Sequence, residues 1–250
     1  MTQPAITITN IIWGFDRTTH QVTVLLLKRA EAPFQGYWAL PETTLRFNES
    51  ADEAALRLVR EKIGLNLDSF HTEQLATFTH PRRTPQQRTL SLAYMTFLPE
   101  LPALTPGYGA TAAKWFTFTP QADRYQVQAG PLTFTTQPAT SQASYYAALA
   151  KRTATPQTAL AFDHDWILTV ACDRIRNKLD YQPNILLILG PAFTLKAART
   201  VFAAFLRLDL TAIDNSNFKK NHQHLLTAVG TTAATHAGRP AKLYRLNYLA

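Results

Sequence analysis

The sequence of 250 residues contains one cysteine, Cys172, which excludes an internal disulfide and fits a reducing compartment. No run of residues approaches the ~18 consecutive apolar residues of a membrane span. The first ten residues lack the charged and apolar regions of a secretory signal. Hydrophobic residues make up 46% of the chain and charged residues 17%, which argues against a disordered protein. We therefore expect a globular, cytoplasmic protein that has no membrane partner.

Glutamate is absent after Glu100, and the net charge of +8 is unevenly distributed as a result. Residues 156–250 hold 11 lysines and arginines against 6 aspartates. From Asp214 to the last residue, five basic residues face a single aspartate. A basic terminus of this kind favours a polyanionic partner, nucleic acid before membrane.

Residues 36–65 predict a strand, a loop and a short helix. Ser50 is a candidate N-cap, and Glu53, three residues later, completes a reciprocal capping box. Gly64 suits the end of a helix because it tolerates a positive φ. One apolar stripe at helical spacing consists of Ala55, Leu56, Val59 and Ile63. These signals predict a helix over 51–63.

The same stretch resembles the Nudix box, in which a glycine and a glutamate precede the helical pattern R-E-U-x-E-E-x-G-U, with U bulky and aliphatic. The positions that match in register are Glu49, Arg57, Val59, Glu61, Gly64 and Leu65. Three positions depart from the pattern. Thr43 replaces the opening glycine, Leu58 replaces the first glutamate of the R-E pair, and Lys62 replaces the last glutamate. A surface helix with a chance likeness is the alternative.

Nudix proteins place three carboxylates at the positions of residues 58, 61 and 62, which share one helix face as i, i+3 and i+4. Such carboxylates bind the Mg²⁺ ions that assist cleavage of a phosphoanhydride. Here only Glu61 remains, beside the cation of Lys62. We therefore predict no catalytic residue, no metal site and no required cofactor, with hydrolysis lost or vestigial. Our hypothesis is that Lys62 neutralises a diphosphate, so that the pocket binds a nucleotide without cutting it.

Further strands are predicted on both sides of the box. Residues 6–14 and 22–28 form a hairpin around the turn-prone DRTTHQ, and the second strand is apolar enough to be buried on both faces. The remaining predicted strands are 74–78, 88–97 and 114–119.

Two groups of residues in this part are candidates for ligand binding. Arg29 and Trp38 lie in the K/R-R and G-x-W elements that precede the box helix in Nudix proteins. The loop HPRRTPQQ, which Arg82, Arg83 and Arg88 occupy or flank, resembles the P-x-R-x-P-x-x-R-T segment of Nudix-type regulators. The planar guanidinium of arginine suits phosphate or carboxylate. The alternatives are a plain core aromatic for Trp38 and a solvated charged loop for the arginines.

Residues 121–157 give the weakest signal, and we expect a low-complexity insertion or linker, with a short helix as the alternative. The motif LAFDH follows at 160–164. Asp163 is the predicted N-cap of the next helix, and His164 is expected to cap rather than to bind a metal, because no Cys/His cluster accompanies it. Cys172 is expected to be a small core residue of that helix rather than a nucleophile.

The C-terminal part predicts a winged helix. One helix starts at Thr194, and Asp214 is the predicted N-cap of a second helix over 215–226. Phe218, His222 and Leu225 share the inner face of that second helix. Its exposed face carries small, amide and basic side chains of the kind that read the major groove, namely Ser216, Asn217, Lys219, Lys220 and Gln223.

Two strands then flank a tip that carries Arg239, close to Lys242. An arginine there can contact phosphate or enter the minor groove. The alternative is a small helical domain used for dimerisation.

The order of these features resembles the Nudix-related transcriptional regulators of NAD metabolism. The shared features are the altered box, LAFDH, a helix that begins F-T-L, the sequence N-F-K-K and the terminal GRPAKLYRL. The resemblance implies an α+β fold with a Nudix-like α/β/α sandwich around a mixed sheet in residues 1–160. A winged helix-turn-helix domain in residues 161–250 follows. It also implies a homodimeric repressor that binds palindromic double-stranded operator DNA and leaves it when the effector, ADP-ribose or a related nucleotide, binds.

The predicted ligand-binding residues are Arg29, Trp38, Glu61, Lys62, Arg83 and Arg88. The predicted DNA contacts are Ser216, Asn217, Lys219, Lys220, Gln223, Arg239 and Lys242. Closure of the pocket is expected to move the helix that starts at Asp163, and with it the two recognition helices of the dimer. Two other functions are open. The first is an active Nudix hydrolase of ADP-ribose or another nucleoside diphosphate derivative that uses Glu49 and Glu61. The second is a protein-interaction module.

Overall fold

The structure of the protein is a computed structural model that describes residues 3–63, 72–85, 87–138, 141–233 and 240–247. The strands of the large sheet are β1 (Ala5–Asp16), β2 (Gln21–Arg29), β3 (Trp38–Ala39), β4 (Glu42–Thr44), β5 (Thr72–Phe78), β6 (Thr89–Phe97), β7 (Ala110–Pro120), β8 (Tyr125–Ala129) and β9 (Leu132–Thr135). The helices that pack on it are α1 (Ala51–Ile63), α2 (Gln142–Leu149), α3 (His164–Lys178) and the 3-10 helix η1 (Asn184–Leu189). The C-terminal elements are β10 (Phe193–Thr194), α4 (Leu195–Leu206), η2 (Leu210–Ala212), α5 (Asn215–His222), β11 (Leu226–Thr231) and β12 (Lys242–Leu246).

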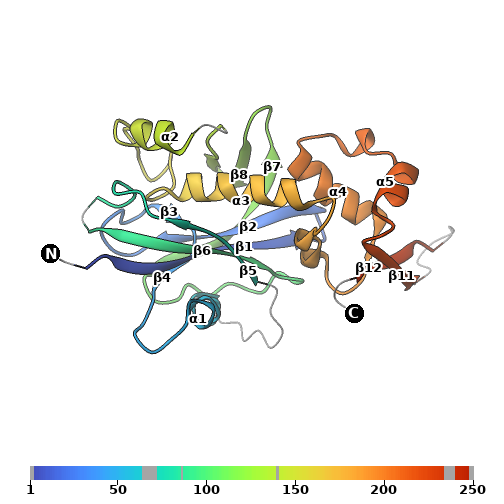
Figure 1. Ribbon diagram of the computed structural model, residues 1–250, viewed down its shortest axis with the longest axis horizontal. Helices are drawn as coiled ribbons and strands as arrows, with labels where there is room; N and C mark the ends of the chain where they lie inside the picture. The colour runs from blue at the N-terminus through green and yellow to red at the C-terminus, as the bar shows by residue number, and fades with distance from the viewer. Residues whose placement is uncertain (1–2, 64–71, 86, 139–140, 234–239, 248–250) are drawn as a thin grey trace.

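The large sheet runs in the order β5-β6-β1-β2-β7-β8-β9, with β3 beside β2 and β4 beside β1. It is mixed, because β1 and β6 are parallel while β1 and β2 form an antiparallel hairpin. Helix α1 lies on one face of the sheet, and α2 and α3 lie on the opposite face (Figure 1). The smaller sheet, β10-β12-β11, lies with α4 and α5 at one end of the molecule. The arrangement is the predicted sandwich followed by a winged helix.

The predicted capping box at the start of α1 is present. The Ser50 amide donates to Glu53 Oε2 at 2.7 Å, and the Glu53 amide donates to Ser50 Oγ at 3.2 Å. Thr194 and Asp214 cap α4 and α5 in the same way, by accepting from the amides of Ala197 and Asn217. These caps satisfy amides that a helix leaves unpaired at its start, which explains why local sequence locates these starts well. The predicted role of Gly64 lies outside the described residues.

The buried face of α1 differs from the predicted stripe. The buried apolar side chains are Ala54, Ala55, Leu58 and Val59, whereas Leu56 is only half-buried. Leu58 is 0% exposed and belongs to a cluster with Ile12, Leu25 and Leu98. Leu58 therefore does not share an open face with residues 61 and 62, because the helix turns it towards the sheet.

Residues 121–157 contain β8, β9 and α2, so the short helix given as the alternative for this segment is present and two strands that were not predicted accompany it. Strands β8 and β9 form a hairpin that extends the large sheet beyond β7. Helix α2 buries Tyr145 and Tyr146 and is therefore packed against the rest of the protein. The polar Thr, Gln and Ala composition hides these elements, because their few aromatic side chains supply most of the packing.

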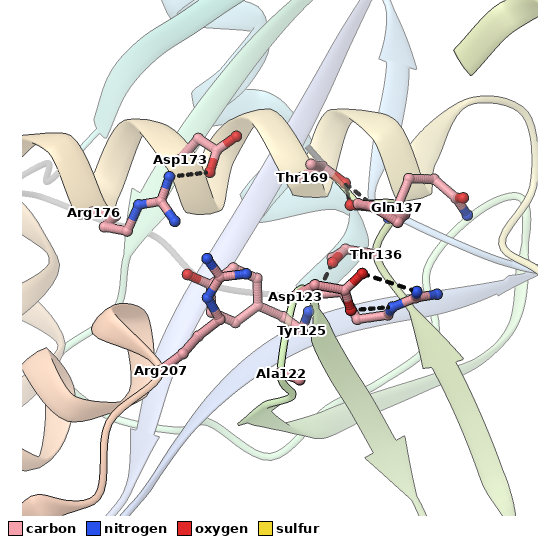
Figure 2. Close-up of a pocket in the computed structure, with 11 residues that line it drawn as sticks. Ala122, Asp123, Tyr125, Thr136, Gln137, Thr169, Asp173, Arg176 and Arg207 are labelled. Carbon is pink, nitrogen blue, oxygen red and sulfur yellow. Dashed lines mark hydrogen bonds and ion pairs between the residues drawn. The ribbon is translucent and has the colours of Figure 1, made fainter. Parts of the chain in front are cut away.

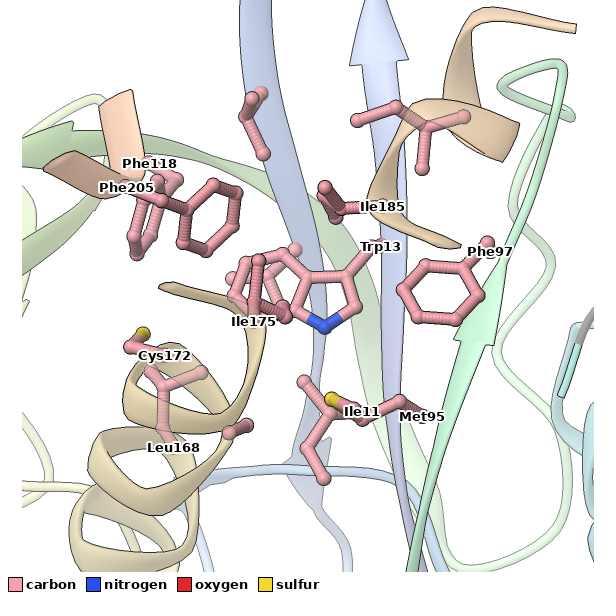
Figure 3. Close-up of a cluster of buried hydrophobic side chains, with 14 of the residues drawn as sticks. Ile11, Trp13, Met95, Phe97, Phe118, Leu168, Cys172, Ile175, Ile185 and Phe205 are labelled. Atoms are coloured by element: carbon pink, nitrogen blue, oxygen red, sulfur yellow. The ribbon is translucent and has the colours of Figure 1, made fainter. Parts of the chain in front are cut away.

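One hydrophobic core connects the large sheet to the winged helix. Trp13 lies at its centre, among side chains that come from the sheet, from α3, from η1 and from α4 (Figure 3). The Trp13 ring packs edge-on against Phe118 of β7 at 5.3 Å and against Phe205 of α4 at 5.4 Å. Cys172 is buried within α3, as predicted. Because Phe205 comes from the C-terminal part, the core does not stop at residue 160.

The second helix of the C-terminal part is shorter than predicted. Helix α5 ends at His222, and the chain enters β11 at Leu226. Phe218, His222 and Leu225 are buried as predicted. The Phe202 ring of α4 packs against both Phe218 and His222 at 4.9 Å, which fixes the inner face of α5.

We predict that Phe205→Ala will lower the free energy of unfolding by about 3 to 5 kcal/mol, as is usual when a buried aromatic ring is deleted. The ring joins α4 to Trp13 and Phe118, so its loss leaves a cavity between the two parts. Urea denaturation followed by tryptophan fluorescence measures the change. The matched control is Phe47→Ala, because Phe47 is fully exposed and its removal should change stability by less than about 0.5 kcal/mol. Equal effects of the two substitutions would contradict the packing described.

Candidate functional site

The carboxylates of the Nudix-like box are bound to a buried arginine. Arg57 is 5% exposed. Its guanidinium donates to both oxygens of Glu49, at 2.8 and 2.6 Å, and to Glu61 at 2.9 Å. It also donates to the Thr43 hydroxyl at 3.0 Å and to the Thr44 carbonyl at 2.9 Å. Arg57 therefore uses its planar fork to hold the loop before α1 and the helix itself together.

These contacts keep both carboxylates ionised. The hydrogen bonds from Arg57 lower the pKa of Glu49 to about 2, and a further hydrogen bond from the amide of Arg46 acts in the same direction. For Glu61, desolvation would raise the pKa, but the hydrogen bonds and charges of Arg57 and Arg46 together outweigh it and the pKa is lowered. Arg46 adds a second ion pair to Glu61 at 3.1 Å. Both carboxylates are thus engaged by arginines rather than directed at a common open point.

The remaining box positions offer no ligand for a divalent cation. Leu58 is buried, and the Lys62 ammonium donates to the carbonyl of Tyr108. Burial lowers the pKa of Lys62. No group of three metal-ligating side chains occurs among the described residues. Among the described residues, the donor set around α1 therefore does not fit the Mg²⁺ that a Nudix box would hold, because Mg²⁺ requires several converging oxygen atoms.

Two further predicted ligand-binding residues, Arg29 and Trp38, lie on the neighbouring strands β2 and β3 of the large sheet. The guanidinium of Arg29 lies 4.7 Å from the centre of the Phe162 ring, and its Nε donates to the Pro33 carbonyl at 3.0 Å. Trp38 is buried and packs edge-on against Phe116 at 5.1 Å. The Trp38 ring thus contributes to the core, and its predicted contact with a ligand stays a prediction.

The arginine loop before β6 contains one buried and two exposed cations. Arg83 is 2% exposed and donates to both carboxylate oxygens of Asp163, at 3.0 and 3.2 Å, whereas Arg82 and Arg88 are exposed. The Tyr146 hydroxyl of α2 donates to the same carboxylate at 2.6 Å. Asp163 precedes α3 as predicted, but its side chain caps no amide, because these two donors occupy it.

The expected capping role of His164 is wrong. Its Nδ1 accepts a hydrogen bond from the amide of Leu40 at 3.0 Å, and its Nε2 lies 3.7 Å from Glu42 Oε2. Desolvation would raise the pKa of Glu42, but its contacts with His164 and the nearby charge of Arg83 outweigh this and lower the pKa. His164 therefore ties α3 to β4 and to the chain before it.

A pocket lies between the arginine loop, the end of α2 and the start of α3. It is lined by Phe34, Arg82, Arg83, Pro85, Leu149, Ala150, Arg152, Ala154 and Phe162. Of the predicted ligand-binding residues, Arg83 lines this pocket directly and Arg29 reaches its wall through Phe162. Glu61 and Lys62 are grouped separately on α1, and Arg88 is not among the lining residues. Sequence reasoning missed Phe34 and Arg152, for which the chain offers no local signal.

A second pocket lies where α3, the β7-β8 turn and the end of α4 meet (Figure 2). Its charged side chains are mostly paired with each other, because Arg176 binds Asp173 at 3.1 Å and Arg124 binds Asp123 at 2.9 Å. Arg207, in left-handed conformation with φ of 58°, extends over the ring of Tyr125. Most charges in this pocket are therefore neutralised by an oppositely charged side chain that also lines it. In the pocket beside Arg83, no acidic side chain is among the lining residues.

The outer face of α5 is exposed and basic. The side chains that were predicted to meet DNA are exposed where the structure describes them, namely Ser216, Asn217, Lys219, Lys220, Gln223 and Lys242. Arg239 lies outside the described residues. A groove beside α5 is lined by Thr194, Leu195, Lys196, Asn215, Lys219, Ala241, Lys242 and Tyr244. Lysines from α4, α5 and β12 thus converge on one groove that no aspartate or glutamate lines.

None of the helices in the described part of the chain has the length and apolar character needed to cross a bilayer.

Comparison with known proteins identifies two regions of this chain. The family model of the NUDIX domain matches residues 5–131, and that of the NrtR DNA-binding winged helix domain matches residues 185–246. The chain is 25% identical over 245 residues to the ADPR responsive transcriptional repressor NtrR of Acinetobacter baylyi, covering 97% of this chain and 82% of the relative.

Solved structures share the same fold. A MutT/nudix family protein from Enterococcus faecalis is similar with a TM-score of 0.83 and 29% identity, covering 99% of this chain and 88% of the other. Shewanella oneidensis NrtR complexed with a 27mer DNA is similar with a TM-score of 0.65 and 23% identity, covering 97% of this chain and 93% of the other. The likeness therefore extends over both the large sheet and the winged helix.

The lowered pKa of Glu49 predicts a pH-dependent contribution to stability. Its folded pKa of about 2 lies below its ordinary value of 4.5, so the ion pair with Arg57 stabilises the fold fully above pH 4.5 and loses that effect as the pH falls towards 2. We expect Glu49→Gln to lower the free energy of unfolding by about 2 kcal/mol near neutral pH, and by progressively less in acid.

Urea denaturation of the wild type and the variant between neutral and acidic pH measures this convergence. Glu100→Gln is the control, because Glu100 is exposed and its removal should shift stability little at any pH. A constant difference between the wild type and Glu49→Gln over the whole range would contradict the assignment.

Proposed function

This chain belongs to the Nudix family and ends in a winged helix of the NrtR type, and on that basis we propose that it is a transcriptional repressor. The proposed repressor binds double-stranded operator DNA through its winged helix and is released by ADP-ribose or a related nucleotide. By the resemblance of the chain to regulators of NAD metabolism, the controlled genes belong to that metabolism. The ADPR responsive repressor of Acinetobacter baylyi, 25% identical along nearly the whole chain, supports this function.

The observation that carries the proposal is the basic outer face of α5. Lys219 and Lys220 are exposed, while Phe218 and His222 on the opposite side are buried against α4. A short helix with its apolar side held by the domain and its basic side free has the form of a helix that enters the major groove. Lys196 and Lys242 border the adjoining groove and extend the positive surface beyond α5. The S. oneidensis NrtR structure with DNA shares this fold.

We propose that the Nudix domain binds its nucleotide without cleaving it. The engagement of Glu49 and Glu61 by Arg57 supports this proposal, as do the burial of Leu58 and the cation of Lys62. A divalent cation at α1 would have to displace the charge-assisted hydrogen bonds of Arg57. Lys62 can instead neutralise phosphate, and Arg29 and Arg83 supply further cations near the wall formed by Phe162.

Helix α3 is the proposed link between the two functions. Its N-terminal end is held by Arg83 through Asp163, next to the pocket. Just beyond its C-terminal end, Asp180 lies 3.2 Å from the His222 ring of α5. A nucleotide that binds the released conformation better than the operator-bound one shifts the equilibrium by that difference in affinity. By reciprocity, operator DNA then weakens nucleotide binding by the same factor.

The proposed working form is a homodimer on a palindromic operator. A two-fold axis places two copies of α5 in successive major grooves when the half-sites are one helical turn apart. A change in the direction of α3 in each copy then alters the spacing of the two recognition helices.

A Nudix hydrolase that acts on ADP-ribose is the second candidate function, and the matching of the box at Glu49, Arg57 and Glu61 favours it. A protein-interaction module without DNA or nucleotide is disfavoured by the basic groove at α5.

We predict that replacing both Lys219 and Lys220 by Ala will weaken binding to an operator duplex selected from a random pool. If both lysines contact phosphate, the slope of log K against log salt falls by roughly one per lost contact. Fluorescence anisotropy over a salt series measures affinity and slope together. Arg60→Ala on the distant helix α1 is the control. Arg60 is exposed, and its substitution removes one cation outside the winged helix. Binding unchanged by the double substitution would exclude α5 from the interface.

We also predict that ADP-ribose will lower operator affinity by about 5- to 150-fold, the usual range of allosteric coupling, and will remain intact. The same anisotropy assay, with ADP-ribose added, measures the first effect, and chromatography of the nucleotide after incubation with Mg²⁺ measures the second. Adenosine, which lacks phosphate, serves as the control ligand. Turnover on the order of 1 s⁻¹ or more would favour the hydrolase instead. If saturating ADP-ribose leaves operator affinity unchanged, ADP-ribose is not the effector.

A further inference from the structure

The pocket beside Arg83 concentrates positive charge in a way that the pocket in Figure 2 does not. Three arginines line it, from the loop before β6 and from the chain after α2, and no acidic side chain is among its lining residues. Asp163 and Asp165 lie behind two of these arginines. Asp163 binds Arg83 at 3.0 Å and Asp165 binds Arg152 at 2.6 Å. The two aspartates offset two of the three charges, and Arg82 remains exposed at the rim.

Two hydrogen-bond donors at this pocket are buried without an acceptor among the described residues. They are Nη1 of Arg83, whose side chain is 1% exposed, and Nε of Arg152. Each guanidinium binds its aspartate through other nitrogens, so the named donor is left without an acceptor among the described residues. A buried donor without an acceptor destabilises the protein, and more so when the group is charged. An acceptor that enters the pocket removes this cost, which favours an anion with several oxygen atoms.

Aromatic rings form the opposite wall of the pocket. Phe34 and Phe162 both adopt left-handed backbone conformations, with φ of 64° and 57°, and their ring centres lie 4.8 Å apart. Such conformations are rare for large side chains and cluster at ligand-binding sites, where the surrounding structure holds them. The Arg29 guanidinium lies over the Phe162 ring, on the way to Lys62.

We infer that this pocket binds the phosphate-bearing part of a nucleotide, with diphosphate oxygens on Arg82, Arg83 and Arg152 and an apolar wall at Phe34 and Phe162. The inference rests on the proposed function and gives a place and a chemical class to its effector. Arg29 adds a further cation next to this wall, through its contact with the Phe162 ring. A nucleoside diphosphate conjugated to a sugar carries two adjacent phosphates, whose oxygen atoms can accept hydrogen bonds from the three arginines.

The pocket is connected to α3 by the two ion pairs behind it. Asp163 also accepts from Tyr146, and Asp165 also accepts from Tyr145 at 2.6 Å, so α2 is held against the start of α3. The His80 ring of the arginine loop stacks on Tyr146 at 3.8 Å. A diphosphate that attracts Arg83 and Arg152 draws them from their aspartates and loosens the hold of α2 on α3. Residues 141–157 would thus transmit the binding of a ligand in this pocket to helix α3.

The test compares nucleotide binding by Arg82→Ala and Lys151→Ala in the full-length protein, by titration calorimetry with ADP-ribose, ADP and inorganic pyrophosphate. Arg82 makes no side-chain contact that the fold depends on among the described residues, and Lys151 is an exposed cation near the pocket that does not line it. Losing one charge-assisted contact should weaken binding of ADP-ribose and ADP by about tenfold or more in Arg82→Ala. Lys151→Ala should stay within about twofold of the wild type, because the Lys151 side chain is exposed and does not line the pocket.

A second variant, Ala154→Trp, fills the pocket without removing a charge, and it should abolish binding while operator affinity without nucleotide is kept. Nucleotide binding that is equal in the wild type and both pocket variants would overturn the inference and leave the proposed repressor intact. Binding of pyrophosphate alone, lost in Arg82→Ala, would support the phosphate contacts. Absence of operator binding by the wild type would instead refute the proposed function, whatever the pocket binds.

Discussion

The buried ion pair between Arg83 and Asp163 is the contact on which the arrangement of both halves depends. It fixes a loop of the large sheet to the first turn of α3, the helix that runs towards the winged helix. A buried pair of this kind stabilises little by itself, but losing one partner leaves an unpaired charge inside the protein and is costly. The direction of α3, and therefore the position of α5, is consequently tied to the surroundings of one guanidinium.

A second arginine, Arg57, pairs with carboxylates at the altered box of α1. In this chain Arg57 takes up the carboxylates that remain, and Leu58 adds apolar area to the core where a carboxylate would otherwise require solvent or a metal. The same contacts hold the loop before α1 against the helix. The proposed phosphate contacts lie in another pocket, which Arg82, Arg83 and Arg152 line.

Sequence patterns predicted the parts whose signals are local. The caps at Ser50, Thr194 and Asp214, the hairpin of β1 and β2 and the buried face of α5 depend on residues within a few positions of each other. The fold of residues 121–157 and the side-chain partner of Asp163 could not be predicted in this way. Tyr146 and Arg83 reach Asp163 from 17 and 80 residues away, and no spacing rule connects such positions.

The continuous core around Trp13 also limits how such a protein can evolve. Phe205 of the winged helix is packed into the same cluster as the sheet residues, so the shape of each module is complementary to the other. Recombination that exchanged the winged helix for an unrelated one would expose this cluster and lose the complementary surface. New DNA specificities in this lineage are therefore expected to arise by substitution on the outer face of α5 rather than by swapping whole domains.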